Sequence, residues 1–187
     1  MTAAAELFRQ RGYAATGIKA VLEASDAPYG SLYHFFPGGK QQLGVTVIET
    51  GGDVYKQLVR TMYDEHGDDV VAATRRFFEG AAELLESTGF ADACPIATIA
   101  GEIAGSNEPM RLASAKAFGS WIDELDERFQ HAGLPPEASH ALAVELFCLI
   151  EGAFLLARTI RDATPVRVAG HRAAASLEGA LVRVSAR

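Results

Sequence analysis

The apolar residues of the sequence recur at helical spacing over most of its length, and this pattern limits the fold more than any other feature. Between Leu43 and Met62 an apolar position returns every three or four residues, which is the repeat of one helix face. No segment alternates apolar and polar residues for long enough to indicate a β-strand. The sequence therefore predicts an all-α chain of about nine helices.

Glycine, proline and capping residues divide the pattern into segments. One helix is expected in each of residues 2–11, 17–24, 28–34, 40–65, 68–88, 95–104, 109–132, 137–161 and 165–186. The apolar face of the fourth helix is predicted to be Leu43, Val47, Gly51, Val54, Leu58 and Met62. That of the helix after Pro109 is predicted to be Leu112, Ala115, Phe118, Ile122, Leu125 and Phe129.

Residues 16–40 are the most distinctive stretch. Thr16 is expected to cap the helix at 17–24, and Asp26 suits a turn residue with positive φ. Pro28 suits the first turn of the next helix, where its missing N–H is not needed. The predicted small core includes Leu32, Phe35 and Phe36, and the predicted outward positions are Tyr29, Gly30, Ser31, Tyr33 and His34. Tyr33 fits a packed aromatic corner equally well. The pattern is typical of a helix-turn-helix, whose second helix enters the DNA major groove.

The charge distribution allows a nucleic-acid partner only for the N-terminal segment. The chain has a formal net charge of −7, of which residues 1–43 carry +1 and residues 44–187 carry −8. Phosphate therefore repels the larger part of the chain as a block, while the N-terminal segment is weakly attractive. Modest non-specific DNA affinity is expected, increased by doubling in a dimer.

Catalytic and metal-binding chemistry has little support in the sequence. Cys94 and Cys148 form no cluster with histidine at metal spacing, and each is expected in the core. The Gly-Gly-Lys that ends at Lys40 lacks the glycine and the hydroxyl residue of a phosphate loop, since His34 and Gln41 occupy those positions. Glu145 and Glu151 share an apolar helix without a nucleophile or base. We expect no enzyme activity, no metal and no cofactor.

A cytoplasmic, soluble location is expected. Met1 leads directly into a sequence with charged residues, which is unlike a signal peptide. The longest apolar run, Ala141 to Ala157, contains Glu145 and Glu151 and is short for a bilayer span.

Several motifs together resemble the TetR family of transcriptional regulators. The N-terminal ones are Leu7-Phe8, Gly12-Tyr13-Ala14-Ala15-Thr16, Gly30-Ser31-Leu32-Tyr33-His34-Phe35-Phe36 and Lys40-Gln41-Gln42-Leu43. The distal motifs, Cys94-Pro95-Ile96-Ala97, Gly101-Glu102, Phe118, Trp121 and Glu151-Gly152-Ala153, are similar to the LmrA/YxaF-like subgroup. The chain departs from the family at Asp26, Pro28 and Tyr29, where glycine, serine and a basic residue are common.

The resemblance implies a helix-turn-helix domain at residues 1–43 and a ligand-binding and dimerisation domain at 44–187. It implies DNA contacts by Thr16, Lys19, Pro28, Tyr29, Gly30, Ser31, Tyr33, His34 and Lys40. Within this set Thr16 would cap its helix and touch a phosphate, and Lys40 would clamp a phosphate. Tyr29 offers a ring that packs on thymine methyl groups.

The same resemblance implies a homodimer on a palindromic operator, released by a small molecule. The two predicted helices at 137–161 and 165–186 would form the dimer interface. A lipophilic or aromatic effector would contact Met62, Phe78, Cys94, Ile99, Phe118, Trp121, Phe147 and Glu151. The weak basic charge leaves an alternative open, namely a ligand-binding or protein-binding module whose helix-turn-helix no longer binds DNA.

Overall fold

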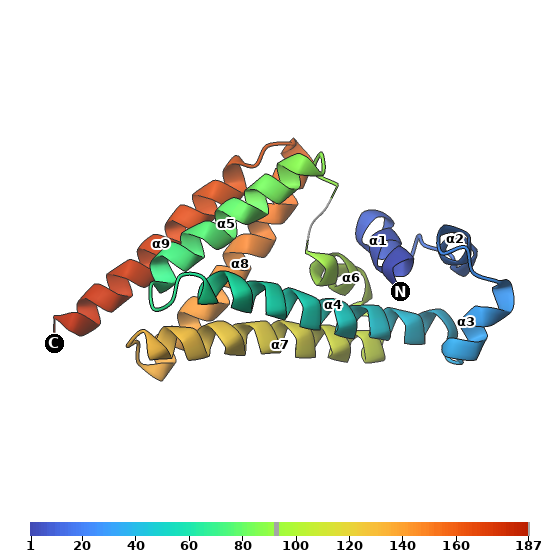
Figure 1. Cartoon of the computed structure of the whole chain (residues 1–187), viewed down its shortest axis with the longest axis horizontal. Coiled ribbons are helices and arrows are strands. Elements are labelled where there is room, and N and C mark those ends of the chain that lie inside the picture. The colour runs from blue at the N-terminus through green and yellow to red at the C-terminus, as the bar shows by residue number, and fades with distance from the viewer. Residues whose placement is uncertain (92–93, 187) are drawn as a thin grey trace. The chain divides into compact units, whose positions relative to one another are not determined.

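The computed structural model describes residues 1–91 and 94–186 of the chain (Figure 1). Its described part contains nine helices and no strand, which confirms the predicted all-α class. The helices are α1 (Thr2–Arg11), α2 (Ile18–Ala24), α3 (Tyr29–Phe35), α4 (Gly39–Asp64), α5 (Val70–Ser87), α6 (Pro95–Ile103), α7 (Glu108–His131), α8 (Pro136–Ile160) and α9 (Thr164–Ser185).

Local sequence signals account for most helix ends. Asp69 caps α5, because its side chain accepts a hydrogen bond from the Ala72 N–H at 2.9 Å. Asp26 has φ of 50°, the left-handed turn conformation that was predicted. Pro28 lies one position earlier than predicted: it is the N-cap of α3, with an extended backbone (φ −60°, ψ 145°), and the helix begins at Tyr29.

The chain divides into two compact units. The first comprises Met1–Val54 and Asp92–Phe118, and the second comprises Tyr55–Ala91 and Gly119–Arg187. Helices α4 and α7 each contribute residues to both units. The functional boundary predicted between residues 43 and 44 stays a prediction, since the first unit contains residues from both sides of it.

The core of the first unit joins the three N-terminal helices to α6 and to the first parts of α4 and α7. Helix α6 packs against α1, and α2 packs against α1 and α3. The buried side chains include Ala4, Leu7, Phe8, Val21, Leu22, Leu32, Leu43, Ile96, Ile99 and Ile103. A Cβ added to Gly52 of α4 would lie 2.9 Å from the Ala117 Cβ of α7, so the absence of a side chain lets these two helices approach closely.

The core of the second unit is built on α9, which packs against both α5 and α8. Its largest fully buried side chains include Trp121, Tyr63, Phe78, Phe129, Leu85 and Leu125. The Tyr63 hydroxyl lies 2.8 Å from the Thr74 hydroxyl in a buried hydrogen bond, which satisfies the polar end of this core tyrosine.

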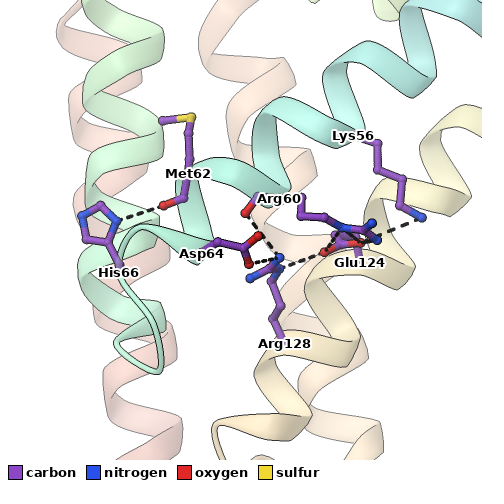
Figure 2. A network of polar contacts seen from close by, with 7 residues as sticks. All are labelled: Lys56, Arg60, Met62, Asp64, His66, Glu124 and Arg128. Atoms are coloured by element: carbon purple, nitrogen blue, oxygen red, sulfur yellow. Dashed lines mark hydrogen bonds and ion pairs between the residues drawn. The ribbon is translucent and has the colours of Figure 1, made fainter.

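A buried carboxylate joins α4 to α7 inside the second unit (Figure 2). The Glu124 side chain is only 6% exposed and accepts hydrogen bonds from Arg60 Nη2 at 2.5 Å and from Arg128 Nε at 2.9 Å. Lys56 Nζ lies 4.0 Å from it, and Arg128 also donates to Asp64 at 2.7 Å. The hydrogen bond from Arg60 holds the pKa of the Glu124 carboxyl below its usual value, against the opposing effect of burial.

The predicted apolar faces of α4 and α7 are wrong in part. Val54 and Leu58 of α4 are exposed, as are Leu112 and Ala115 of α7. Leu43 and Val47 are buried as predicted, and the other buried positions of α4 include Ile48, Gly52, Val59 and Tyr63. Helix α7 approaches α4 closely at two glycines, since a Cβ added to Gly44 would lie 2.7 Å from Met110 and one added to Gly52 would lie 2.9 Å from Ala117.

Two predicted core residues are also exposed. Phe35 is 69% exposed, because Phe36, one helical turn after the buried Leu32, takes the inward position and is half-buried. Cys148 is exposed on α8, whereas Cys94 is buried as predicted.

Helix α8 is the one helix of the described residues that is long and apolar enough to cross a membrane. It spans 25 residues and so extends beyond the apolar run considered in the sequence, and 39% of its most apolar window is buried. Length and composition alone are weak support for a membrane span, since a core helix of a soluble protein has the same composition.

Candidate nucleic-acid interface

The helix-turn-helix of the first unit comprises α2, a tight turn and α3. The Ala27 N–H donates to the Leu22 carbonyl at 3.0 Å, and the Ser25 hydroxyl donates to the Val21 carbonyl at 2.8 Å. These bonds satisfy the C-terminal carbonyls of α2 and close the turn at Asp26. The direction of α3 relative to α2 is therefore fixed by local hydrogen bonds and by the buried Leu32.

The outer face of α3 is open. Tyr33 and His34 are exposed, and Pro28 is exposed at the helix start. A Cβ added to Gly30 would meet nothing within 4 Å, so no neighbouring group of the described chain covers this position. Three of the predicted DNA-contact residues, Gly30, Tyr33 and His34, thus lie at helical spacing on one accessible face of α3, whereas Pro28 lines a pocket with Ser31 and Phe35.

Ser31 and Tyr29 stand apart from this group. Ser31 is half-buried and its hydroxyl donates to the Pro28 carbonyl at 2.6 Å, so it stabilises the start of α3. The backbone of Tyr29 begins α3, but its side chain lies outside the described part of the structure.

The predicted role of Thr16 as the cap of α2 is wrong. The N-cap of α2 is Gly17, with no side-chain capping bond. Thr16 is buried, and its hydroxyl donates to the Gly12 carbonyl at 2.7 Å and lies 3.3 Å from the Leu7 carbonyl. Its side chain therefore binds the C-terminal end of α1, and in this position it is not accessible to a DNA phosphate.

Lys19 lies on the exposed face of α2 and is 3.8 Å from Glu23, one helical turn away. Such an exposed pair contributes little stability, so the ammonium group can exchange Glu23 for another anion at small cost.

Lys40 occupies the predicted position at the start of α4 but is half-buried. Its Nζ donates to the Ala14 carbonyl at 3.4 Å and lies 4.2 Å from the centre of the Tyr13 ring. Burial lowers the pKa of the Lys40 ammonium, and the negative charge of Glu102 partly opposes that shift. The ammonium is thus held against the connection between α1 and α2.

Glu102 of α6 lies in the same cluster as Lys40 and Ala14, although it was not predicted to contact DNA or an effector. Its Oε2 accepts a hydrogen bond from the Ala14 N–H at 2.8 Å. The two residues are 88 positions apart, so no local pattern in a single sequence signals their contact.

The residues predicted to bind an effector belong to both units. In the first unit, Cys94 caps α6 by accepting from the Ala97 N–H at 3.4 Å, Ile99 is buried, and Phe118 is half-buried. The cap and the core positions give these side chains structural roles whether or not an effector binds. Their membership of one pocket stays a prediction.

In the second unit, Trp121 is fully buried and stacks on Phe147 with ring centres 5.8 Å apart. Met62 is half-buried near the end of α4, where its carbonyl lies 2.9 Å from a ring nitrogen of His66 (Figure 2). Glu151 is half-buried on α8.

Phe78 lines a groove of about 370 Å³ between α5 and α9, together with Arg75, Arg76 and Arg167. Arg167 pairs there with Glu79 at 3.0 Å. Charged side chains and Phe78 share the lining of this groove, and the role of Phe78 in an effector site stays a prediction.

Among residues 1–91 and 94–186, no group of three or more His, Cys, Asp or Glu side chains is placed to hold a metal ion. Glu145 accepts from the Ser176 hydroxyl at 2.7 Å, which ties α8 to α9 at the surface.

Comparison with known sequences identifies both parts of the chain. A family model described as bacterial regulatory proteins, tetR family, matches residues 1–44. A second, described as transcriptional regulator LmrA/YxaF-like, C-terminal domain, matches residues 70–172.

Full-length relatives agree with both matches. The chain is 33% identical over 163 residues to the uncharacterised HTH-type transcriptional regulator YxaF of Bacillus subtilis. The aligned segment covers 87% of this chain and 85% of the relative. It is 37% identical over 171 residues to the uncharacterised HTH-type transcriptional regulator Rv0196 of Mycobacterium tuberculosis, which covers 89% and 86%.

A solved structure agrees with the fold. The regulatory protein TetR from Rhodobacter sphaeroides superposes with a TM-score of 0.84 at 24% identity, over 94% of this chain and 95% of that one. Three findings point to the same family. They are the N-terminal helix-turn-helix, the match of the C-terminal domain and the relatives that align with most of the chain. The chain therefore belongs to the TetR family of transcriptional regulators and carries a C-terminal domain of the LmrA/YxaF-like type.

Proposed function

We propose that the protein is a ligand-responsive transcriptional repressor that binds a palindromic operator as a homodimer. The observation that carries this proposal is the accessible outer face of α3, formed by Gly30, Tyr33 and His34 on a helix-turn-helix whose turn is held by local hydrogen bonds. Residues 1–43 supply the DNA contacts, and residues 44–187 supply dimerisation and effector binding. Because its target is bacterial operator DNA, the protein works in the cytoplasm.

The DNA contacts divide into two kinds. Gly30 allows a close approach of the α3 backbone to the groove, and Tyr29 is the proposed contact to base edges, including thymine methyl groups. Lys19 and Lys40 bind backbone phosphates, which position the protein without reading sequence. Ser31 acts through the start of α3, and Thr16 acts through the end of α1, because their hydroxyl groups are bound to backbone carbonyls.

Dimerisation uses the outer surfaces of α8 and α9. Leu155 is 71% exposed, and the adjacent Leu156 and the later Ile160 of α8 are also exposed. Helix α9 adds the exposed Val168 and Val182. Large apolar side chains on two neighbouring helices favour burial by a second copy of the chain, which would place two helix-turn-helix motifs on one operator.

Effector control works by a shift between two populations of the dimer. An effector that binds the conformation unable to hold DNA more tightly than the competent one moves the equilibrium by that difference in affinity, and by no more. The proposed effector is small and lipophilic or aromatic, because the predicted contact residues are mostly apolar. Helix α4 is the proposed mechanical link, since it begins at the Lys40 contact and continues into the second unit.

Fluorescence anisotropy with labelled DNA from upstream of the protein's own gene tests the repressor proposal. We expect saturable binding to one segment, with affinity that falls steeply as salt is raised because counterions are released. Absence of salt-sensitive binding by a folded dimer would contradict the proposal and favour a module whose helix-turn-helix no longer binds DNA.

Two substitutions separate positioning contacts from base contacts. Lys40→Ala is expected to weaken binding to every duplex and to reduce the slope of affinity against salt by about one phosphate contact per subunit. Tyr29→Ala is expected to change the preferred bases with little change in the salt slope. Equal loss on all sequences for both variants would refute this division of roles.

A further inference from the structure

The Glu102 carboxylate of α6 lies against the turn between α1 and α2 in the first unit. Glu102 of α6 accepts a hydrogen bond from the Ala14 N–H at 2.8 Å. Its other carboxylate oxygen lies against Gly12, where an added Cβ would overlap it, and Gly12 has φ of 82°. Gly12 therefore meets two demands at once, a left-handed backbone and the close approach of a side chain from α6.

Lys40 reaches the same turn from α4. Its Nζ donates to the Ala14 carbonyl, so the amide unit at Ala14 has its N–H bound to Glu102 and its C=O bound to Lys40. The Tyr13 ring lies beneath the ammonium, 4.2 Å from Nζ. Attraction between Lys40 and Glu102 acts across this short turn. The two side chains, one from α4 and one from α6, thus form a polar cluster with the connection between α1 and α2.

A DNA phosphate can bind both kinds of donor in this cluster, the backbone N–H that Glu102 holds and the ammonium of Lys40. Phosphate oxygens accept from backbone N–H groups and from lysine ammonium groups, as a carboxylate does. We propose that Glu102 competes with the DNA phosphate for Lys40 and thereby limits how tightly the helix-turn-helix holds DNA. This proposal rests on the proposed role of Lys40 as a phosphate contact and adds a positioning residue that acts through it.

The size of the effect follows from the attraction that Lys40 must give up in order to bind a phosphate. For two unit charges about 7 Å apart in water, giving up the attraction of Glu102 weakens phosphate binding by Lys40 about three-fold. Two copies in a dimer would together weaken it about ten-fold. Salt screens both interactions, so the difference should shrink as the Debye length falls below about 10 Å.

The variant Glu102→Gln separates charge from position. Glutamine has nearly the same volume, and its side-chain carbonyl can still accept from the Ala14 N–H, so the turn is retained while the charge is lost. Glu49→Gln is the matched control, because Glu49 is an exposed carboxylate on α4 of the same unit. It lies nine residues after Lys40, about 13 Å along the helix and beyond the Debye length at 0.1 M salt.

The experiment measures anisotropy of labelled upstream and random duplexes with the full chain, in the wild type and four variants. These are Glu102→Gln, Lys40→Ala, the double variant and Glu49→Gln, each checked for folding by circular dichroism. We expect Glu102→Gln to bind both duplexes about three- to ten-fold more tightly at 0.1 M salt, and less so at higher salt. The gain should be lost in the Lys40→Ala background, and Glu49→Gln should match the wild type.

Two results would overturn the proposal while the repressor function stands. One is that Glu102→Gln binds no more tightly than the wild type although Lys40→Ala binds more weakly, since Glu102 would then only position the turn. The other is an equal gain in the Lys40→Ala background, since Glu102 would then act on DNA without Lys40. If the wild type itself binds no DNA, the proposed function fails and this proposal fails with it.

Glu102→Asp keeps the test decisive if Glu102→Gln does not fold. Aspartate retains the charge at a shorter reach, so its affinity for DNA is expected between those of the wild type and an uncharged side chain. Affinity below that of the wild type in a folded Glu102→Asp protein would contradict competition for Lys40.

Discussion

Glu124→Gln is expected to lower the free energy of unfolding by about 2 kcal/mol at neutral pH. Removing one partner of a buried ion pair costs about 3–5 kcal/mol, whereas an exposed pair is worth about 0–1 kcal/mol. Glu124 is 6% exposed, but its partners Arg60 and Arg128 are 45% and 18% exposed. Water can therefore solvate the arginines that the substitution leaves behind, and the cost falls between the two limits.

The assay is urea unfolding at fixed protein concentration, followed by the fluorescence of Trp121. Trp121 is the only tryptophan of the sequence, is fully buried, and lies on α7 in the same unit as Glu124. Its emission will therefore report the loss of structure around the network. Asp123→Asn, a neighbouring exposed carboxylate on the same helix, is the control and is expected to change stability by less than about 0.5 kcal/mol.

The pH dependence gives the prediction its sign. The pKa of Glu124 is lowered in the folded protein, so its stabilisation is present above the unfolded value of about 4.3 and is lost as pH falls through the lower folded pKa. The difference between the wild type and Glu124→Gln should be constant near neutral pH and should shrink in acid. A difference below about 0.5 kcal/mol at neutral pH, or one that grows in acid, would refute this reasoning.

Two further substitutions test other parts of the structure. Thr16→Val should lower the free energy of unfolding in urea by about 1–2 kcal/mol, because it removes a buried hydroxyl that binds the end of α1. The slope of DNA affinity against salt should stay unchanged. A lower salt slope in a variant that is still folded would show that Thr16 contacts phosphate. Leu155→Glu on α8 should convert the proposed dimer to a monomer, as measured by light scattering after size exclusion. Leu84→Glu, on the exposed face of α5, is the control and should leave the protein dimeric. A Leu155→Glu protein that stays dimeric would show that the interface lies elsewhere.

The elements with local signals were predictable from the sequence. The turn at Asp26 depends on the backbone preference of one residue, and the position of Lys40 at the start of α4 depends on the break before it. The all-α class followed from spacing within each helix. These features need only neighbours in sequence, which is why a single sequence predicted them.

Features that depend on distant contacts were not predictable in this way. The burial of Glu124 depends on cations from α4 and α7. The inward face of α4 depends on Gly52, which permits the close approach of α7. The contact of Glu102 with Ala14 joins α6 to the turn after α1. In each case the controlling partner is far away in the chain, so only the folded structure brings it into view.

Footprinting of the upstream DNA with the purified protein is the most direct test of the central claim, that α3 binds DNA in pairs. If α3 binds DNA in pairs, two half-sites related by a two-fold axis will be protected. Their centres will lie one helical turn apart, about 34–36 Å, or a multiple of that spacing, on one face of the DNA. Protection should be lost together at both half-sites as salt is raised. A single protected half-site, or diffuse protection without symmetry at any protein concentration, would contradict the account.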